Sequence, residues 1–205
     1  MSESQNRYVE YKNVFLWQYI CDHELVVCPR CNKASKVENA EFYCLHCHLH
    51  LNECDKFHWY GDLQLTTKSN QSCYHCGSPL FYQNVIHAPH DNFSKKITLE
   101  CEKCQKQNSV TLQKMIIHKY QGEDYYFGLP LLLQMSCSHG ILWAYNWQHL
   151  QDLKAFIQAD LRERTKNSGN GSLMSRLPLW IKSAKNREGL LKLITKIEKL
   201  VQIES

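Results

Sequence analysis

The sequence predicts an α+β fold in which small antiparallel sheets precede a helix-rich C-terminal region. Three observations lead to this prediction. Eight of the 11 cysteines form four C-x-x-C pairs, short runs rich in β-branched and aromatic residues flank those pairs, and apolar residues recur at steps of three and four nearer the C-terminus. The 205 residues, 43% of them hydrophobic, suit one or two ordinary domains or several very small ones.

The expected compartment decides how the cysteines are interpreted. The N-terminal stretch MSESQNRYVEYKNVF lacks the basic-then-apolar pattern of a signal peptide, and no apolar run reaches the roughly 18 residues of a membrane span. We therefore expect a cytoplasmic protein that does not cross a membrane. Disulfides rarely persist in that reducing environment, so an odd cysteine total with paired spacing predicts metal sites.

The four C-x-x-C pairs predict two structural Zn²⁺ ions. Zn²⁺ takes four ligands in a tetrahedron, and two C-x-x-C turns supply four thiolates. Twelve residues separate the first pair from the second, and 24 separate the third from the fourth, which suits two strands and a turn in each case. We expect two tandem zinc ribbons, with a crossed pairing of the turns as the alternative. The ligands are Cys28, Cys31, Cys44 and Cys47 in the first ribbon and Cys73, Cys76, Cys101 and Cys104 in the second.

Strands are predicted around each pair of turns. In the first ribbon, HELVVC and VENAEFYC lead into the two turns. In the second, PLFYQNVIHA runs outward, SKKITLEC returns after the turn PHDN, and NSVTLQKMII follows. About 35 residues per ribbon cannot build a large core, so the metal is expected to replace one.

The stretch YCLHCHLHLNEC contains three histidines besides its cysteines. The favoured interpretation is a strand whose histidines face solvent while Leu49 and Leu51 face inward. The alternative is a further metal site formed by His48, His50 and Cys54, which lacks an obvious fourth ligand.

No catalytic motif is found, so the protein is not expected to be an enzyme. Four thiolates fill the zinc coordination shell, and the sequence contains no H-E-x-x-H, no zinc-deaminase pattern, no G-x-S-x-G and no Gly-rich phosphate loop. Cys21 lies near His23 and Cys137 near His139, so each is a candidate for a Cys–His nucleophile pair. The expected role of the unpaired Cys21, Cys54 and Cys137 is burial as small apolar residues, and a third metal site is the other alternative.

The C-terminal region is predicted to combine a hairpin with amphipathic helices. The apolar run YYFGLPLLLQMSC reads as a buried strand, with ILWAY as its partner across SHG. Asn146 is a candidate cap for a helix over 147–166, and the polar loop TKNSGNGS follows. Pro178 suits the first turn of a short helix, and Asn186 can cap the last one.

A resemblance rests on the runs YYFGLPLLLQMSC, ILWAYNWQHLQDLKAFIQADLRER and SLMSRLPLWIKSAKNREGLLKLITKIEKL. They resemble the C-terminal region of uncharacterised bacterial proteins that contain a zinc ribbon of the transcription-factor-IIB type. The resemblance covers roughly residues 125–200, with the C-x-x-C turns upstream in the same order. It implies a bacterial protein with ribbons fused to a helical part, and it implies no particular activity.

The charge is unevenly distributed over three predicted segments. Residues 1–60, the first ribbon with its N-terminal extension, carry six Lys/Arg and eight Asp/Glu. Residues 61–120, the second ribbon, carry seven and four, and residues 121–205, the apolar strand and helices, carry eleven and eight. The net charges are therefore −2, +3 and +3, which leaves the first ribbon acidic and weakens a continuous surface for a polyanion.

Two kinds of macromolecular partner are consistent with this pattern. A protein partner is favoured, with the chain acting as an adaptor or as an inhibitor such as an immunity protein that neutralises a bacterial toxin. The alternative is nucleic-acid binding through a basic face and exposed aromatic residues. No small-molecule substrate is inferred. The candidate partner-binding residues are Arg176, Lys182, Lys185 and Arg187, although charged helix faces are also ordinary solvated surfaces.

Overall fold

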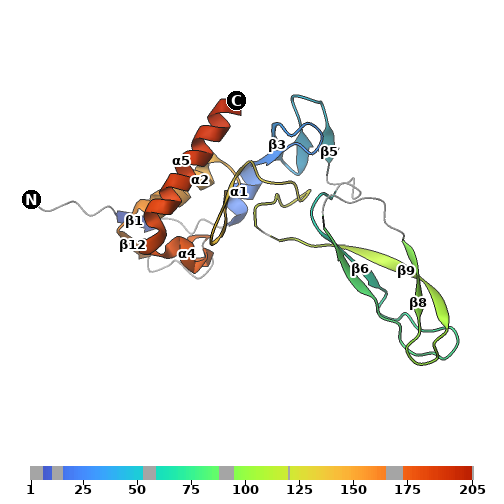
Figure 1. Cartoon of the computed structure of the whole chain (residues 1–205). Helices are drawn as coiled ribbons and strands as arrows, with labels where there is room; N and C mark the ends of the chain where they lie inside the picture. Colours follow the sequence, from blue (N-terminus) through green and yellow to red (C-terminus); the bar gives the residue numbers. More distant parts are fainter. Residues whose placement is uncertain are drawn as a thin grey trace, which may run out of the picture. The chain divides into compact units, whose positions relative to one another are not determined.

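The computed structural model describes residues 7–10, 16–52, 59–87, 95–119, 121–164 and 173–204. These residues form an α+β structure with small sheets and a long C-terminal helix (Figure 1). The chain divides into two compact units, of which unit 1 comprises Met1–Lys56 and Tyr120–Ser205 and unit 2 comprises Phe57–Lys119. None of the described helices is long and apolar enough to cross a membrane.

The N-terminal sheet of unit 1 contains four antiparallel strands in sequential order. They are β2 (Glu24–Val27), β3 (Ala34–Glu38), β4 (Glu41–Tyr43) and β5 (His50–Asn52). Asn39 and Ala40 join β3 to β4 with φ values of 52° and 60°, the left-handed conformation that both central residues of a tight hairpin turn adopt. One face of the sheet is buried through Val37, Phe42 and Leu51.

The C-terminal part of unit 1 packs a hairpin against two helices. Strands β10 (Leu133–Cys137) and β11 (Gly140–Ala144) pair across the predicted Ser-His-Gly turn, and α2 (Trp147–Gln158) contacts α5 (Arg187–Glu204) (Figure 1). As predicted, Asn146 caps α2, because its side-chain oxygen accepts the His149 N–H at 2.9 Å. The fully buried core residues include Leu133, Leu142, Leu150, Leu153, Ile157 and Ile194.

The helix predicted over 147–166 ends earlier, at Gln158. Ala159 has an extended backbone with ψ of 136°, and β12 (Leu161–Arg164) follows. This strand pairs in parallel with β1 (Arg7–Glu10), near the start of the chain. A partner so distant in sequence leaves no trace in local apolar periodicity, which explains the difference.

Short helices complete unit 1. They are α1 (Leu16–Asp22), α3 (Leu173–Arg176), α4 (Leu179–Lys182) and the 3₁₀ turn η1 (Ala184–Asn186). Pro178 stands at the N-cap of α4, close to its predicted place in the first turn. Asn186 directly precedes α5, and its side-chain amide donates to the Trp180 carbonyl at 2.9 Å.

Unit 2 is a four-stranded antiparallel sheet in the order β7-β6-β9-β8. The strands are β6 (Leu63–Thr67), β7 (Gln83–Ile86), β8 (Lys96–Glu100) and β9 (Gln107–Ile116). The sequence runs expected to form strands do so, but β6 lies between β7 and β9 and was not predicted. Its alternation of buried Leu63, Leu65 and Thr67 with partly exposed residues is the signal that marks it as a half-buried strand.

Candidate metal centres

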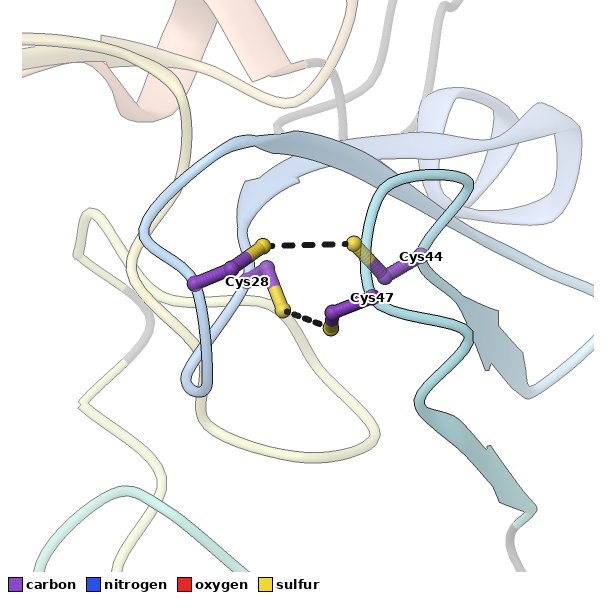
Figure 2. A group of neighbouring side chains, drawn as sticks. Cys28, Cys44 and Cys47 are labelled. Atoms are coloured by element: carbon purple, nitrogen blue, oxygen red, sulfur yellow. Dashed lines mark hydrogen bonds between the residues drawn. The ribbon is translucent and has the colours of Figure 1, made fainter.

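The first cysteine group lies beside the N-terminal sheet of unit 1. The turn Cys28–Cys31 follows β2, and the turn Cys44–Cys47 follows β4, so the β3–β4 hairpin brings the two turns face to face. Cys28 Sγ is 3.6 Å from Cys47 Sγ, and Cys31 Sγ is 3.5 Å from Cys44 Sγ. Figure 2 shows the thiol of Cys28 facing those of Cys44 and Cys47 from the opposite turn.

The second group forms in unit 2 by the same arrangement. The Cys73–Cys76 turn lies between β6 and β7, and the Cys101–Cys104 turn joins β8 to β9. Cys73 Sγ is 3.6 Å from Cys104 Sγ, and Cys76 Sγ is 3.6 Å from Cys101 Sγ. The structure thus brings together the first pair with the second and the third with the fourth.

The sulfur separations fit a shared metal ion. A disulfide requires sulfurs about 2.05 Å apart, which is far shorter than the distances in either group. Tetrahedral Zn²⁺ with bonds of about 2.3 Å places its sulfurs about 3.8 Å apart. All four Sγ atoms of each group lie within 4.8 Å of one another, so the two four-cysteine groups could hold two metal ions, for which zinc is the typical occupant.

The local environment lowers the pKa of at least one thiol in each four-cysteine group, which favours the thiolate that binds metal. Burial raises the pKa of Cys44, but hydrogen bonds from the Ser35 hydroxyl and the backbone of Cys47 outweigh it and bring the pKa to about 6. In unit 2 burial is likewise outweighed by backbone N–H groups, which bring the pKa of Cys73 to about 6. Burial raises the pKa of Cys31 to about 12. Such a thiol must lose its proton on metal binding, so the affinity of the group increases with pH.

The four C-x-x-C turns share one backbone conformation. The residue after each second cysteine has a positive φ: 57° at Asn32, 55° at His48, 71° at Gly77 and 59° at Gln105. Its N–H donates to the carbonyl of the first cysteine at 2.7–3.0 Å. The N–H of the first cysteine in turn donates to the carbonyl five residues later, at 2.8–3.0 Å. This pattern directs both thiols of a turn to the same side.

A fifth turn of the same form occurs in unit 1 without cysteine. The Asp124 N–H donates to the Leu129 carbonyl at 2.8 Å, and Gly128 has φ of 67°, as Gly77 does in the turn that begins at Cys73. The Asp124 carboxylate accepts the N–H groups of Tyr126 at 2.9 Å, Phe127 at 2.8 Å and also Leu129. An acidic side chain thereby satisfies donors inside the turn, as a metal-bound thiolate does.

Sequence similarity to the third C-x-x-C turn could have revealed this fifth turn. The stretch EDYYFGLPL aligns with SCYHCGSPL, sharing the first tyrosine, the glycine, the proline and the final leucine. The bridge between Ser72 and Pro79 recurs between Glu123 and Pro130. The sequence predicts a strand from Tyr125 onward. The strand instead begins at Leu133, because the residues before it fold around Asp124.

The fifth turn anchors the N-terminal sheet to the rest of unit 1. The Val27 N–H donates to the Pro130 carbonyl at 2.9 Å, and the Leu132 N–H donates to the Leu25 carbonyl at 2.9 Å. At the same junction, the fully buried Glu24 carboxyl accepts the Tyr125 N–H at 3.1 Å through Oε2. Its Oε1 has no hydrogen-bond partner among the described residues.

Glu24 and Asp124 form a buried carboxyl pair. Burial, followed by the charge of Asp124, raises the pKa of Glu24 to about 8. Burial also raises the pKa of Asp124, to about 7, against the lowering effect of its three backbone hydrogen bonds. Those bonds make Asp124 the first of the pair to ionise, so Glu24 retains its proton at neutral pH.

We expect this junction to lose stability as pH rises from about 4.5 to about 8. The pKa of Glu24 is higher in the folded state than its ordinary 4.5, so its contribution is fully present below about pH 4.5 and is lost as pH rises through about 8. The loss should be on the order of a few kcal/mol. Urea unfolding at several pH values with saturating zinc measures it. Glu24→Gln, which stays neutral, should flatten the fall in stability between about pH 4.5 and about 8, and equal slopes for the variant and the wild type over that range would contradict the assignment.

The histidines and unpaired cysteines take no part in either four-cysteine group. His46, His48 and His50 are exposed and Leu51 is buried, as expected, although the strand begins only at His50. Among the described residues, no metal-ligating cluster other than these two groups is found. The prediction that the unpaired cysteines are buried is wrong for Cys21, which is exposed, while Cys137 is only half-buried and Cys54 lies outside the described residues.

The candidate partner-binding cations differ in their surroundings. Arg187 is ion-paired with Asp160 at 2.5 Å and also donates to the Ala159 carbonyl at 2.8 Å. Arg176 and Lys185 are exposed, and Lys182 is half-buried at the end of α4.

Comparisons with protein-family models, curated protein sequences and solved structures found no match. The function is therefore inferred from the residues of this chain alone.

Proposed function

We propose that the chain is a non-catalytic interaction protein in which two structural Zn²⁺ ions hold two zinc ribbons and whose partner is another protein. The convergence of four cysteines at each centre supports a structural ion. Four thiolates complete the coordination shell of zinc, whereas catalytic zinc keeps a position for water or substrate. The ions then make the turns rigid, and a rigid surface loses less conformational entropy when it binds.

The observation that carries the proposal is the exposure of two apolar residues on the metal-binding turns. Leu45 directly follows Cys44 and is 78% exposed, and Tyr74 directly follows Cys73 and is 77% exposed. The equivalent residue of the fifth turn, Tyr125, packs edge-on against Trp17 with ring centroids 5.8 Å apart. At this position of the turn, Tyr125 contacts another residue of the same chain. We infer that Leu45 and Tyr74, at the same position in their turns, contact a partner protein.

One observation favours nucleic acid as the second candidate. Unit 2 exposes a second aromatic residue besides Tyr74, namely Phe81, which is 75% exposed. Lys103 is exposed on the Cys101–Cys104 turn, which belongs to the same four-cysteine group as the turn that carries Tyr74. Exposed aromatic rings next to cations stack on unpaired bases. Residues 61–120 carry a net charge of +3, which is compatible with phosphate contacts.

The test is affinity purification from the host with a double variant, Leu45→Ser with Tyr74→Ser. We expect the wild type to retain a specific protein and the double variant to lose at least about 90% of it, because exposed anchors dominate binding energy. Zinc content should remain at two ions per chain in both. Leu200→Ser is the matched control, since Leu200 is a 55% exposed apolar residue on α5.

Two outcomes would contradict a protein partner. One is equal recovery of the same protein with the wild type and the double variant. The other is tight binding of single-stranded nucleic acid, lost in the double variant, whose affinity falls steeply between about 50 and 200 mM salt. The second result would establish the nucleic-acid alternative in its place.

A further inference from the structure

Unit 1 encloses a cavity of about 680 Å³ between the β10–β11 hairpin, α2 and the α3–α4 segment. Sites for small organic ligands in proteins have volumes of about 300–1,000 Å³ and are mostly apolar, with a few polar groups that fix orientation. The cavity matches this description. Its apolar walls include Ile141, Trp143, Leu153, Leu177, Trp180 and Ile181.

Aromatic side chains dominate two of the walls. The Trp180 ring stacks on His139 with centroids 5.9 Å apart and an interplanar angle of 16°. Trp143 meets the His149 ring edge-on at 5.6 Å. Rings held by such contacts offer flat, preformed surfaces that suit another planar ring.

The most buried polar residue of the lining is His149, which is 1% exposed. The Tyr145 N–H donates to its Nδ1 at 3.2 Å, so the proton of the neutral ring lies on Nε2. Burial lowers the pKa of His149 to about 3, which keeps the ring neutral at physiological pH. Nε2 has no hydrogen-bond partner among the described residues. Because Tyr19 stacks on the ring at 4.6 Å, the imidazole is held in this orientation.

The charged residue of the lining is Arg176, at the exposed side of the cavity. It makes no ion pair with another described residue. The surrounding stretch 173–186 contains Arg176, Lys182 and Lys185 and no aspartate or glutamate. The lining contains no aspartate or glutamate, so an anion beside Arg176 meets no fixed negative charge from the cavity walls.

We propose that this cavity binds a small aromatic carboxylate. The ring lies between the walls formed by Trp143 and Trp180, the carboxylate pairs with the Arg176 guanidinium, and an acceptor oxygen at the far end of the ligand takes the His149 Nε2–H. The lining also contains the exposed Gln121 and His139, but the two groups assigned to the ligand, the Arg176 guanidinium and the His149 Nε2–H, are both donors and require acceptors at both ends of the ligand. This site is separate from the cysteine turns and does not depend on what they bind.

The probe for this proposal is 4-hydroxyphenylacetate, which carries a phenol oxygen opposite its carboxylate. Binding is followed by NMR through the indole N–H signals of the five tryptophans, assigned with single Trp→Phe variants. We expect saturable shifts at Trp143 and Trp180, while Trp17 and Trp59 stay unchanged. Tyramine, which replaces the carboxylate by an amine, should not bind. Phenylacetate, which lacks the phenol oxygen, should bind about tenfold more weakly, as expected for the loss of one buried hydrogen bond.

A variant pair tests the charged contact. Arg176→Gln should weaken binding of 4-hydroxyphenylacetate by about tenfold or more, the loss expected for one charge-assisted hydrogen bond. Lys185→Gln removes a cation that is also exposed but does not line the cavity, and it should leave the affinity within about twofold of wild type. The absence of shifts at Trp143 and Trp180, equal binding of tyramine, or equal losses in the two variants would each overturn the proposal.

Discussion

Replacing Cys73 by serine is expected to unfold residues 57–119 and to lower the bound zinc from two ions per chain to one. Cys73 is 3% exposed and belongs to the small core of unit 2, whose other buried members are Leu65, Leu80, Cys101, Val110 and Leu112. A core of this size cannot stabilise 63 residues without help. Structural zinc contributes about 10–16 kcal/mol in small zinc-dependent peptides, which exceeds the net stability of most domains.

Elemental analysis and amide hydrogen exchange together measure this effect. The exchange data should show loss of protection in β6–β9, and the zinc content should fall by one ion. Cys137→Ser is the matched control, because Cys137 is a half-buried thiol outside both four-cysteine groups. A Cys73→Ser protein that retained two zinc ions and protected amides would disprove the assignment of the second centre.

The second large effect is expected at Asp124, where no metal is involved. Asp124→Ala removes the acceptor of three backbone N–H groups within a buried turn. Two of these donors, the N–H groups of Phe127 and Leu129, are buried, and each buried donor left unsatisfied costs about 1–3 kcal/mol, so we expect a loss of about 2–6 kcal/mol in the free energy of unfolding. The turn also holds strand β2 through the Pro130 carbonyl, so the N-terminal sheet should lose protection together with it.

Urea unfolding of unit 1 with a zinc assay distinguishes this effect from metal loss. Asp124→Ala should unfold at a lower urea concentration while the zinc content at low urea remains two. Asp22→Ala, at a side chain that is 66% exposed and beside His23, is the control and should change stability by less than about 1 kcal/mol. If the two variants were equally stable, the role given to Asp124 would be wrong.

The sequence predicted both four-cysteine groups and their pairing because the ligand chemistry is local. A C-x-x-C turn directs its two thiols to the same side, and a hairpin between two such turns brings all four thiols to one metal ion. Asn146 was predicted as a helix cap for a similarly local reason. The fifth turn was not predicted because it contains no cysteine. Its Asp124 carboxylate accepts the backbone N–H groups of the turn in place of a thiolate.

Features that depend on distant partners were not predictable in this way. The apolar pattern after Trp147 continues past the point where α2 ends, because Leu161 belongs to a strand that pairs with β1. The position of β6 between β7 and β9 is likewise a choice among strand orders that hairpin spacing alone does not determine. The cavity around His149 combines three separate stretches of chain, so no single motif in the sequence indicates it.

The division of unit 1 into two stretches of chain has a consequence for synthesis on the ribosome. The backbone N–H groups of Leu25 and Val27 donate to the carbonyls of Tyr145 and Pro130, which lie more than 100 residues later in the chain. At about 5–20 residues per second, a newly made N-terminal strand waits roughly 5–25 s for those partners. The intervening residues 57–119 contain all four cysteines of their own candidate metal centre and can fold first. During synthesis, unit 2 is thus expected to bind its metal ion and fold before unit 1, whose N-terminal part requires residues from the C-terminal part of the chain.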